Sequence, residues 1–65
     1  MVDGKKVRSL RESKGMTQIE LADKVGVSNK LVSYLEQGFK QPSAVVLGRI
    51  AKLLEVKMED LMKSG

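Results

Sequence analysis

Apolar residues recur at intervals of three and four along most of the chain, which is the spacing of one buried stripe per α-helix. No segment alternates between apolar and polar residues as a half-buried strand does. The pattern therefore predicts an all-α domain whose core is drawn from several short helices. The stripes are Val7 and Leu10; Leu21, Ala22 and Val25; Leu31, Val32 and Leu35; and Leu47, Ile50, Ala51 and Leu54.

Residues suited to begin and end helices divide this pattern into five elements. Thr17 and Glu20 have the spacing of a capping box, in which each side chain bonds the backbone amide of the other. Three further N-cap residues stand before helix-like runs: Asp3, Ser28 and Ser43. Three glycines follow such runs, where a positive φ ends a helix: Gly15, Gly26 and Gly38. We predict one compact domain over residues 1–65, with helices at about 4–14, 18–25, 29–37, 44–54 and 58–62.

The second and third predicted helices are joined by only Gly26, Val27 and Ser28. So short a connection forces a steep crossing, as in a helix-turn-helix unit. The outward arc of the third helix offers amide, ammonium and hydroxyl groups, which read base edges in a major groove about 12 Å wide, and it holds no carboxylate. This arc consists of Asn29, Lys30, Ser33, Tyr34 and Gln37.

The net charge of +4 and the sequence pI near 9.6 favour a polyanionic partner without identifying one. Residues 1–14 carry five basic and two acidic side chains, whereas residues 15–41 carry three of each. The middle segment is therefore neutral. DNA binding there would depend on specific contacts of complementary shape rather than on long-range electrostatic attraction. Taken alone, the polar arc of the third helix is more typical of an ordinary solvated helix face than of a DNA-binding one.

The residue types present argue against catalysis and against a metal or other cofactor. The chain has no histidine and no cysteine, so the commonest general base, thiol nucleophile and metal ligands are missing. No apolar stretch approaches the roughly 20 residues that cross a bilayer, and the N-terminus does not resemble an export signal. We expect a cytoplasmic protein that is not an enzyme, contacts no membrane and needs no small-molecule ligand.

The joint spacing of these features resembles the phage repressor and Cro family of helix-turn-helix domains, also called the XRE family. The resemblance runs from Val7 to about Leu61 and implies a lambda-repressor-like fold with the helix-turn-helix at helices two and three. It is carried by Thr17, Gln18, Leu21, Ala22, Val25, Gly26, Val27, Ser28, Val32, Ser33, Leu35, Glu36, Gly38, Pro42, Leu47, Ile50, Ala51 and Leu54.

The resemblance also implies a role for particular side chains. Base contacts are implied for Asn29, Lys30, Ser33 and Tyr34. Phosphate contacts are implied for Thr17, Gln18, Ser28, Gln37, Phe39, Lys40 and Gln41. Phe39 departs from the family pattern, in which a basic or polar residue is commoner, and packing on Pro42 is the alternative for its ring. Arg11 and Glu36 are similar to a family ion pair that ties the first helix to the end of the third.

Two questions stay open at this point. The expected function is sequence-specific binding of double-stranded DNA as a transcriptional regulator, with repression favoured and a homodimer on a palindromic operator. The alternative is a protein-interaction module on the same fold, antitoxin-like or coactivator-like, which the neutral middle segment and Phe39 favour. Near the C-terminus, Met58, Leu61 and Met62 either cap the core or form a dimer surface.

Overall fold

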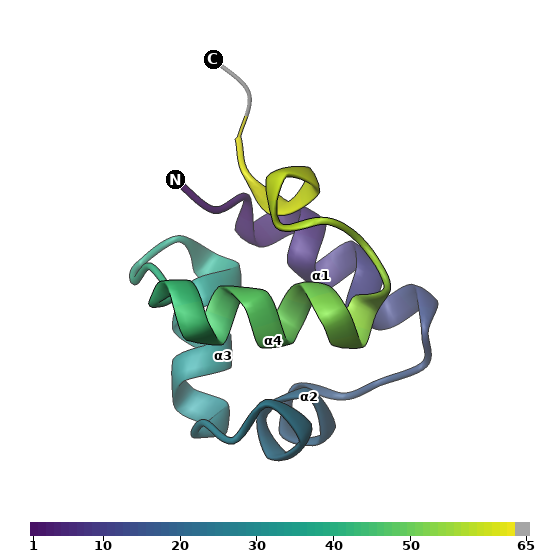
Figure 1. The fold of residues 1–65 in the computed structure, drawn as a ribbon. Coiled ribbons are helices and arrows are strands. Elements are labelled where there is room, and N and C mark those ends of the chain that lie inside the picture. Colours follow the sequence, from purple (N-terminus) through teal and green to yellow (C-terminus); the bar gives the residue numbers. More distant parts are fainter. Residues whose placement is uncertain (64–65) are drawn as a thin grey trace.

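The computed structural model describes residues 1–63 and places four α-helices and one short 3₁₀ helix in them (Figure 1). The elements are α1 (Gly4–Ser13), α2 (Gln18–Val25), α3 (Asn29–Gln37), α4 (Ala44–Leu54) and the 3₁₀ helix η1 (Met58–Leu61). The all-α prediction is confirmed, but the count of five α-helices is wrong. The last element is a single 3₁₀ turn, because it has only four residues and no side chain caps its first amide groups.

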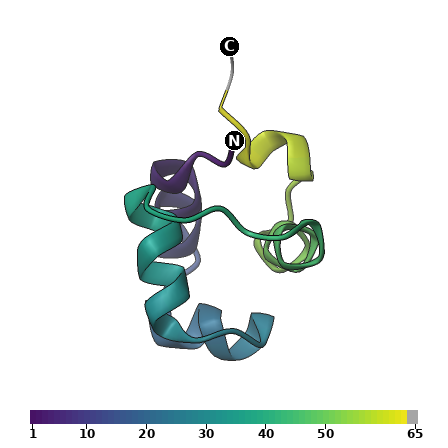
Figure 2. The same cartoon turned by 90° about the vertical axis from the view of Figure 1, so that its left-hand side faces the viewer.

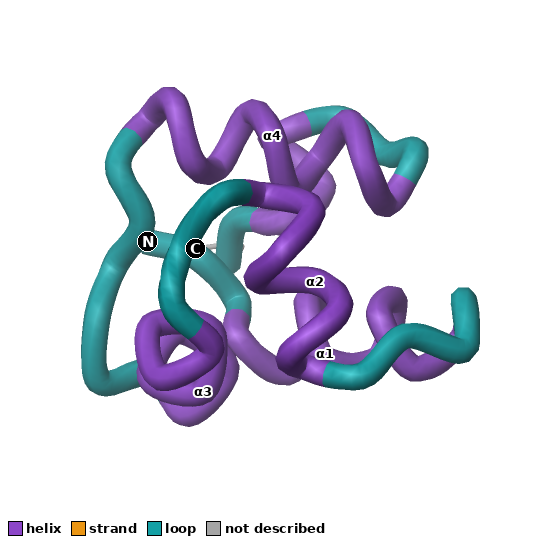
Figure 3. The backbone as a smooth tube through the Cα atoms, turned by 90° about the horizontal axis from the view of Figure 1, so that it is seen from below, coloured by secondary structure: helices purple, strands orange, loops and turns teal. Residues whose placement is uncertain are grey.

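The helices form two layers around the core. Helix α1 packs against the upper part of α3, and α2 crosses the lower end of α3 (Figure 2). Helix α4 packs over α2 and is followed by η1, which contacts both α4 and α1. Figure 3 shows α3 end-on at one edge of the molecule, where only part of its circumference meets the other helices. None of the helices in residues 1–63 has the length and apolar character that a bilayer crossing requires.

Each α-helix begins with the cap that its sequence predicts. The side chains of Asp3, Thr17, Ser28 and Ser43 each accept a hydrogen bond from the amide three residues on. Helices α2 and α3 end at Gly26 and Gly38, both with φ of 84°. Helix α4 ends at Glu55 with φ of 60°, the one positive φ among the non-glycine residues described. A side chain there opposes the left-handed conformation. Backbone hydrogen bonds close this helix end, from the amide of Glu55 to the carbonyl of Lys52 at 3.2 Å and from that of Val56 to Ala51 at 3.0 Å.

The core contains most of the predicted stripes, with Leu10 and Leu31 only partly buried against it, and two residues from near the ends of the chain. Val2 is 3% exposed and Leu61 is fully buried, whereas Met58 and Met62 keep 41% and 37% of their surface exposed. Leu61 therefore belongs to the core, and the two methionines lie at the surface. The amide of Asp3 donates to the carbonyl of Leu61 at 2.7 Å, so the two ends of the chain are paired.

Helix α1 begins in close contact with the end of α3, and Gly4 makes that approach possible. A Cβ atom at residue 4 would lie 2.5 Å from the backbone oxygen of Glu36 and would collide with that of Leu35 as well. Both obstacles are backbone atoms, which cannot rotate away as the end of a flexible side chain can. The sequence spacing of the glycines does not reveal this role, because it depends on a contact between residues over thirty positions apart.

We expect Gly4→Ala to lower the free energy of unfolding by about 1 to 3 kcal/mol, the usual cost of forcing an extra carbon into a packed contact. Gly48→Ala is the matched control, since its Cβ would meet only Met58 Sδ at 3.8 Å. The control should gain roughly 0.5 to 1 kcal/mol from the better helix propensity of alanine. Urea unfolding measures both variants, and equal effects at the two positions would contradict the packing argument.

Candidate nucleic-acid interface

Helices α2 and α3 meet through a tight turn that fixes their crossing. The amides of Gly26 and Val27 both donate to the carbonyl of Ala22, at 2.8 and 3.0 Å. Arg49 on α4 donates to the carbonyl of Val25 at 3.3 Å and so stabilises the last turn of α2. Leu21, the fully buried residue of α2, packs in the core with Val32 and Leu35 of α3. The helix-turn-helix geometry predicted from the three-residue connection is therefore present.

Helix α3 divides cleanly into a buried side and an outward side. Val32 and Leu35 are 1% and 2% exposed, whereas the other side meets solvent. Its only carboxylate, Glu36, is buried, so the outward side of the helix carries none. The five residues of the predicted arc lie there, three of them exposed and two half-buried: Asn29, Lys30 and Gln37, and Ser33 and Tyr34. We call these five residues the outer face of α3.

Aromatic and basic side chains from α3 and from the loop of residues 38–43 gather around the Tyr34 ring. Figure 2 shows this loop leaving the end of α3. The ammonium nitrogens of Lys30 and Lys40 lie 5.7 and 5.6 Å from the centroid of the Tyr34 ring. Phe39 stands edge-on to the same ring, with 6.2 Å between the centroids. The Phe39 residue keeps 71% of its surface exposed, so it is not buried against Pro42. The loop is therefore joined to α3 through the Tyr34 ring.

The Arg11–Glu36 pair forms as the resemblance implies and extends further than the sequence indicates. The guanidinium of Arg11 donates to both carboxylate oxygens of Glu36, at 2.7 and 3.1 Å, and to the carbonyl of Met16 at 2.7 Å. The Gln18 amide also donates to Glu36, at 3.1 Å. The hydrogen bond to Glu36 raises the pKa of Arg11, against the effect of burial. One buried carboxylate thus holds α1, the start of α2 and α3 together.

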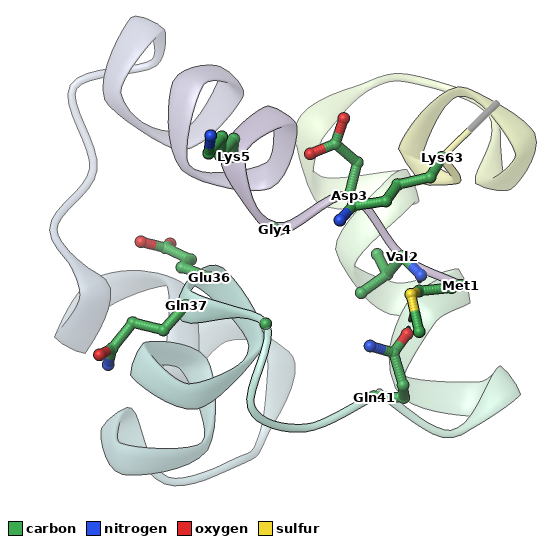
Figure 4. Close-up of a pocket in the computed structure, with 10 residues that line it drawn as sticks. Met1, Val2, Asp3, Gly4, Lys5, Glu36, Gln37, Gln41 and Lys63 are labelled. Carbon is green, nitrogen blue, oxygen red and sulfur yellow. Dashed lines mark hydrogen bonds between the residues drawn. The ribbon is translucent and has the colours of Figure 1, made fainter.

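Gln37 and Gln41 make hydrogen bonds within the chain. The Gln37 side-chain amide donates to the hydroxyl and the carbonyl oxygen of Ser33, at 2.8 and 3.1 Å. The carbonyl oxygen of the Gln41 side chain accepts from the amide of Val2 at 2.8 Å. Figure 4 shows this side chain beside Val2 and Met1, at the hollow where the N-terminus passes the end of α3. Gln41 thus attaches the loop after α3 to the N-terminal segment.

The start of α2 and the start of α3 share a surface hollow, which brings Thr17, Gln18 and Asn29 together. Ser28 is exposed, and its hydroxyl caps α3 by accepting from Leu31 at 3.1 Å. Ile19 also lines this hollow, with 64% of its surface exposed. Our sequence analysis missed Ile19. The available signal was a large apolar residue outside the buried stripe of its helix.

Comparison with known proteins assigns the fold to a family. The model of the helix-turn-helix family matches residues 7–61, which is most of the chain. This chain belongs to the XRE helix-turn-helix family. An uncharacterised HTH-type transcriptional regulator of Mycobacterium tuberculosis is 45% identical over 58 residues, covering 89% of this chain. The chain spans only 41% of that relative's length. A second such regulator, from Archaeoglobus fulgidus, is 41% identical over 56 residues, covering 86% of this chain and 80% of the relative.

Solved structures of the family superpose closely on this chain. The P22 c2 repressor, solved in complex with a synthetic operator, is 28% identical with a TM-score of 0.92, covering 100% of this chain and 98% of the repressor. The biofilm regulator SinR of Bacillus subtilis, solved in complex with DNA, is 30% identical with a TM-score of 0.83. That match covers 89% of this chain and 94% of SinR. The lambda-repressor-like fold is thereby confirmed.

We expect Glu36→Gln to lower stability far more than Glu59→Gln does. Removing one charge of a buried pair leaves Arg11 uncompensated, which costs about 3 to 5 kcal/mol, whereas Glu59 is exposed. Urea unfolding of the two variants at pH 7 gives the comparison. Equal midpoints would show that the pair does not support the fold.

The capping box at the start of α2 should make stability depend on pH. Backbone and side-chain hydrogen bonds with Thr17 lower the pKa of Glu20. A lowered pKa in the folded state means that ionised Glu20 stabilises the fold above its unfolded pKa, and this stabilisation is lost as pH falls through the folded pKa. The stability difference between the wild type and Glu20→Gln should therefore shrink between pH 7 and pH 3. An unchanged difference in urea midpoint would contradict this assignment.

Proposed function

We propose that this chain binds double-stranded DNA with α3 in the major groove and is the DNA-binding part of a transcriptional regulator that acts as a repressor. The observation that carries the proposal is the outer face of α3, which is accessible to a groove and free of carboxylates. The family assignment and the DNA-bound P22 c2 repressor and SinR support it. The same assignment favours a binding module over an enzyme.

The side chains of the outer face have the chemistry of base readers. An amide such as that of Asn29 pairs with adenine, and an ammonium such as that of Lys30 pairs with the acceptors of guanine. Ser33 and Tyr34 lie beside them on the same face. We assign these four residues to the floor of the major groove, where each is within reach of base edges.

Phosphate contacts are proposed on both sides of the outer face. Thr17, Gln18 and Ser28 lie near helix starts, whose free amides favour an anion. On the other side, Lys40 supplies a positive charge from the loop after α3. Next to it, Gln37, Phe39 and Gln41 lie along the backbone of the DNA strand. The hydrogen bond from Gln18 to Glu36 leaves the second amide hydrogen of Gln18 available for a phosphate oxygen.

We further propose that the protein binds a palindromic operator as a homodimer. One helix contacts too few base pairs for a selective site, and two copies related by a two-fold axis double the sequence that is read. The two half-sites would then be about one helical turn apart. This arrangement does not require a dimer in solution, because two copies that dimerise only when bound to the operator satisfy it.

A protein-interaction role is the second candidate, and exposed apolar side chains favour it. Ile19 lines a hollow with Asn29 at the start of α3, and Phe39 follows the end of α3; they keep 64% and 71% of their surface exposed. SinR, which is similar to this chain, has also been solved in a complex with the SinI protein. Binding that does not depend on salt would favour this role over DNA.

Titration against a random duplex at several salt concentrations separates the two roles. DNA binding predicts that log affinity falls with log salt by about 0.9 per phosphate contacted. A selection from randomised duplexes should then yield a preferred palindromic site and its half-site spacing. Lys30→Ala should relax one position of that site, whereas Gln18→Ala should weaken binding to all sequences alike. A flat salt dependence would contradict the proposed function.

A further inference from the structure

Two ammonium groups from different segments converge on one aromatic ring. Lys30 belongs to α3 and Lys40 to the loop that follows it, yet both nitrogens lie within 6 Å of the Tyr34 centroid, at 5.7 and 5.6 Å. A cation at this distance over the face of an aromatic ring is attracted by the negative charge of the π system. The ring therefore offsets the mutual repulsion of two like charges that gather beside it.

The ring is also held in place by its own neighbours. Tyr34 is half-buried, and its sequence neighbour Leu35 is anchored in the core. Phe39 meets the ring at an interplanar angle of 66°, an edge-to-face arrangement that aromatic pairs favour. A lysine side chain on an open surface samples many rotamers and loses that freedom when it binds. Contact with a fixed ring removes part of this freedom before any ligand arrives.

From these contacts we infer that Tyr34 acts as a positioning residue: its ring holds Lys30 and Lys40 as preformed cations for DNA, Lys30 at a base edge and Lys40 at a phosphate. This inference rests on the proposed function, and it replaces a base contact by Tyr34 with an action through the two lysines. The inference also assigns a role to Phe39: although Phe39 carries no charge, its edge-to-face contact supports the Tyr34 ring. The departure from the family pattern at Phe39 is then part of the same arrangement.

The contact itself can be tested without DNA. Protons above an aromatic face resonate upfield, so the ε-methylene protons of Lys30 and Lys40 should be shifted upfield relative to those of Lys52, which lies on α4. The shift should persist in Tyr34→Phe, which keeps the ring, and disappear in Tyr34→Leu. Urea unfolding verifies that the leucine variant is folded. Unshifted protons in the wild type would overturn the inference.

The consequence for DNA is read from the salt dependence of binding to a random duplex. Tyr34→Leu should bind more weakly and lower the slope of log affinity against log salt by about one, since the phosphate contact of Lys40 loses its preformed cation. Phenylalanine at the same position should rescue the slope, because it restores the ring without the hydroxyl. A loss of sequence preference with an unchanged slope in both variants would instead identify Tyr34 as a base reader and overturn the inference.

A double-mutant comparison isolates the link between the ring and one lysine. Lys40→Met should reduce affinity less in the Tyr34→Leu background than in the wild type, whereas Lys52→Met should have the same small effect in both. Strictly additive effects of Tyr34→Leu and Lys40→Met would count against positioning. If the wild type binds no duplex at any salt concentration, both the proposed function and the DNA-binding role of the two lysines are wrong, whatever the proton shifts show.

Discussion

The buried ion pair between Arg11 and Glu36 is the constraint on which the rest of the structure depends. Three segments converge on it: α1 through Arg11, the start of α2 through Gln18, and the end of α3 through Glu36 itself. Apolar packing alone leaves the relative rotation of such short helices loosely determined. An ion pair held by two hydrogen bonds, with a third donor on the same carboxylate, has one favourable geometry. The pair therefore fixes how far α3 projects beyond the other helices.

This arrangement links the interior of the protein to its proposed working surface. Glu36 and the outer face lie on the same helix, so the bond that keeps Glu36 inward also keeps Asn29, Lys30 and Ser33 outward. Gln18, bonded to the same carboxylate, stands at the surface beside Asn29. The Glu36 carboxylate therefore serves both stability and recognition, and a substitution at Glu36 should change the stability of the fold together with DNA binding.

The sequence predicted the local features of this structure well, because they depend on neighbouring residues. The caps at Thr17 and Ser28 and the glycine helix ends required only short-range patterns. Contacts between distant segments were missed: Val2 in the core and Gly4 against α3. The clustering of lysines on Tyr34 depends on how the loop folds back, which periodicity within one helix cannot reveal.

The pairing of the first and last described residues has a practical side. Residues 1 and 63 lie together at one pole of the molecule, whereas the turn between α2 and α3 lies at the opposite one (Figures 1 and 2). A fluorescent reporter or an affinity handle attached to either terminus through a short spacer would thus sit away from the start of α3. The same pole holds Gln41, a proposed phosphate contact whose side chain accepts a hydrogen bond from the amide of Val2, so a label there would report on the loop after α3.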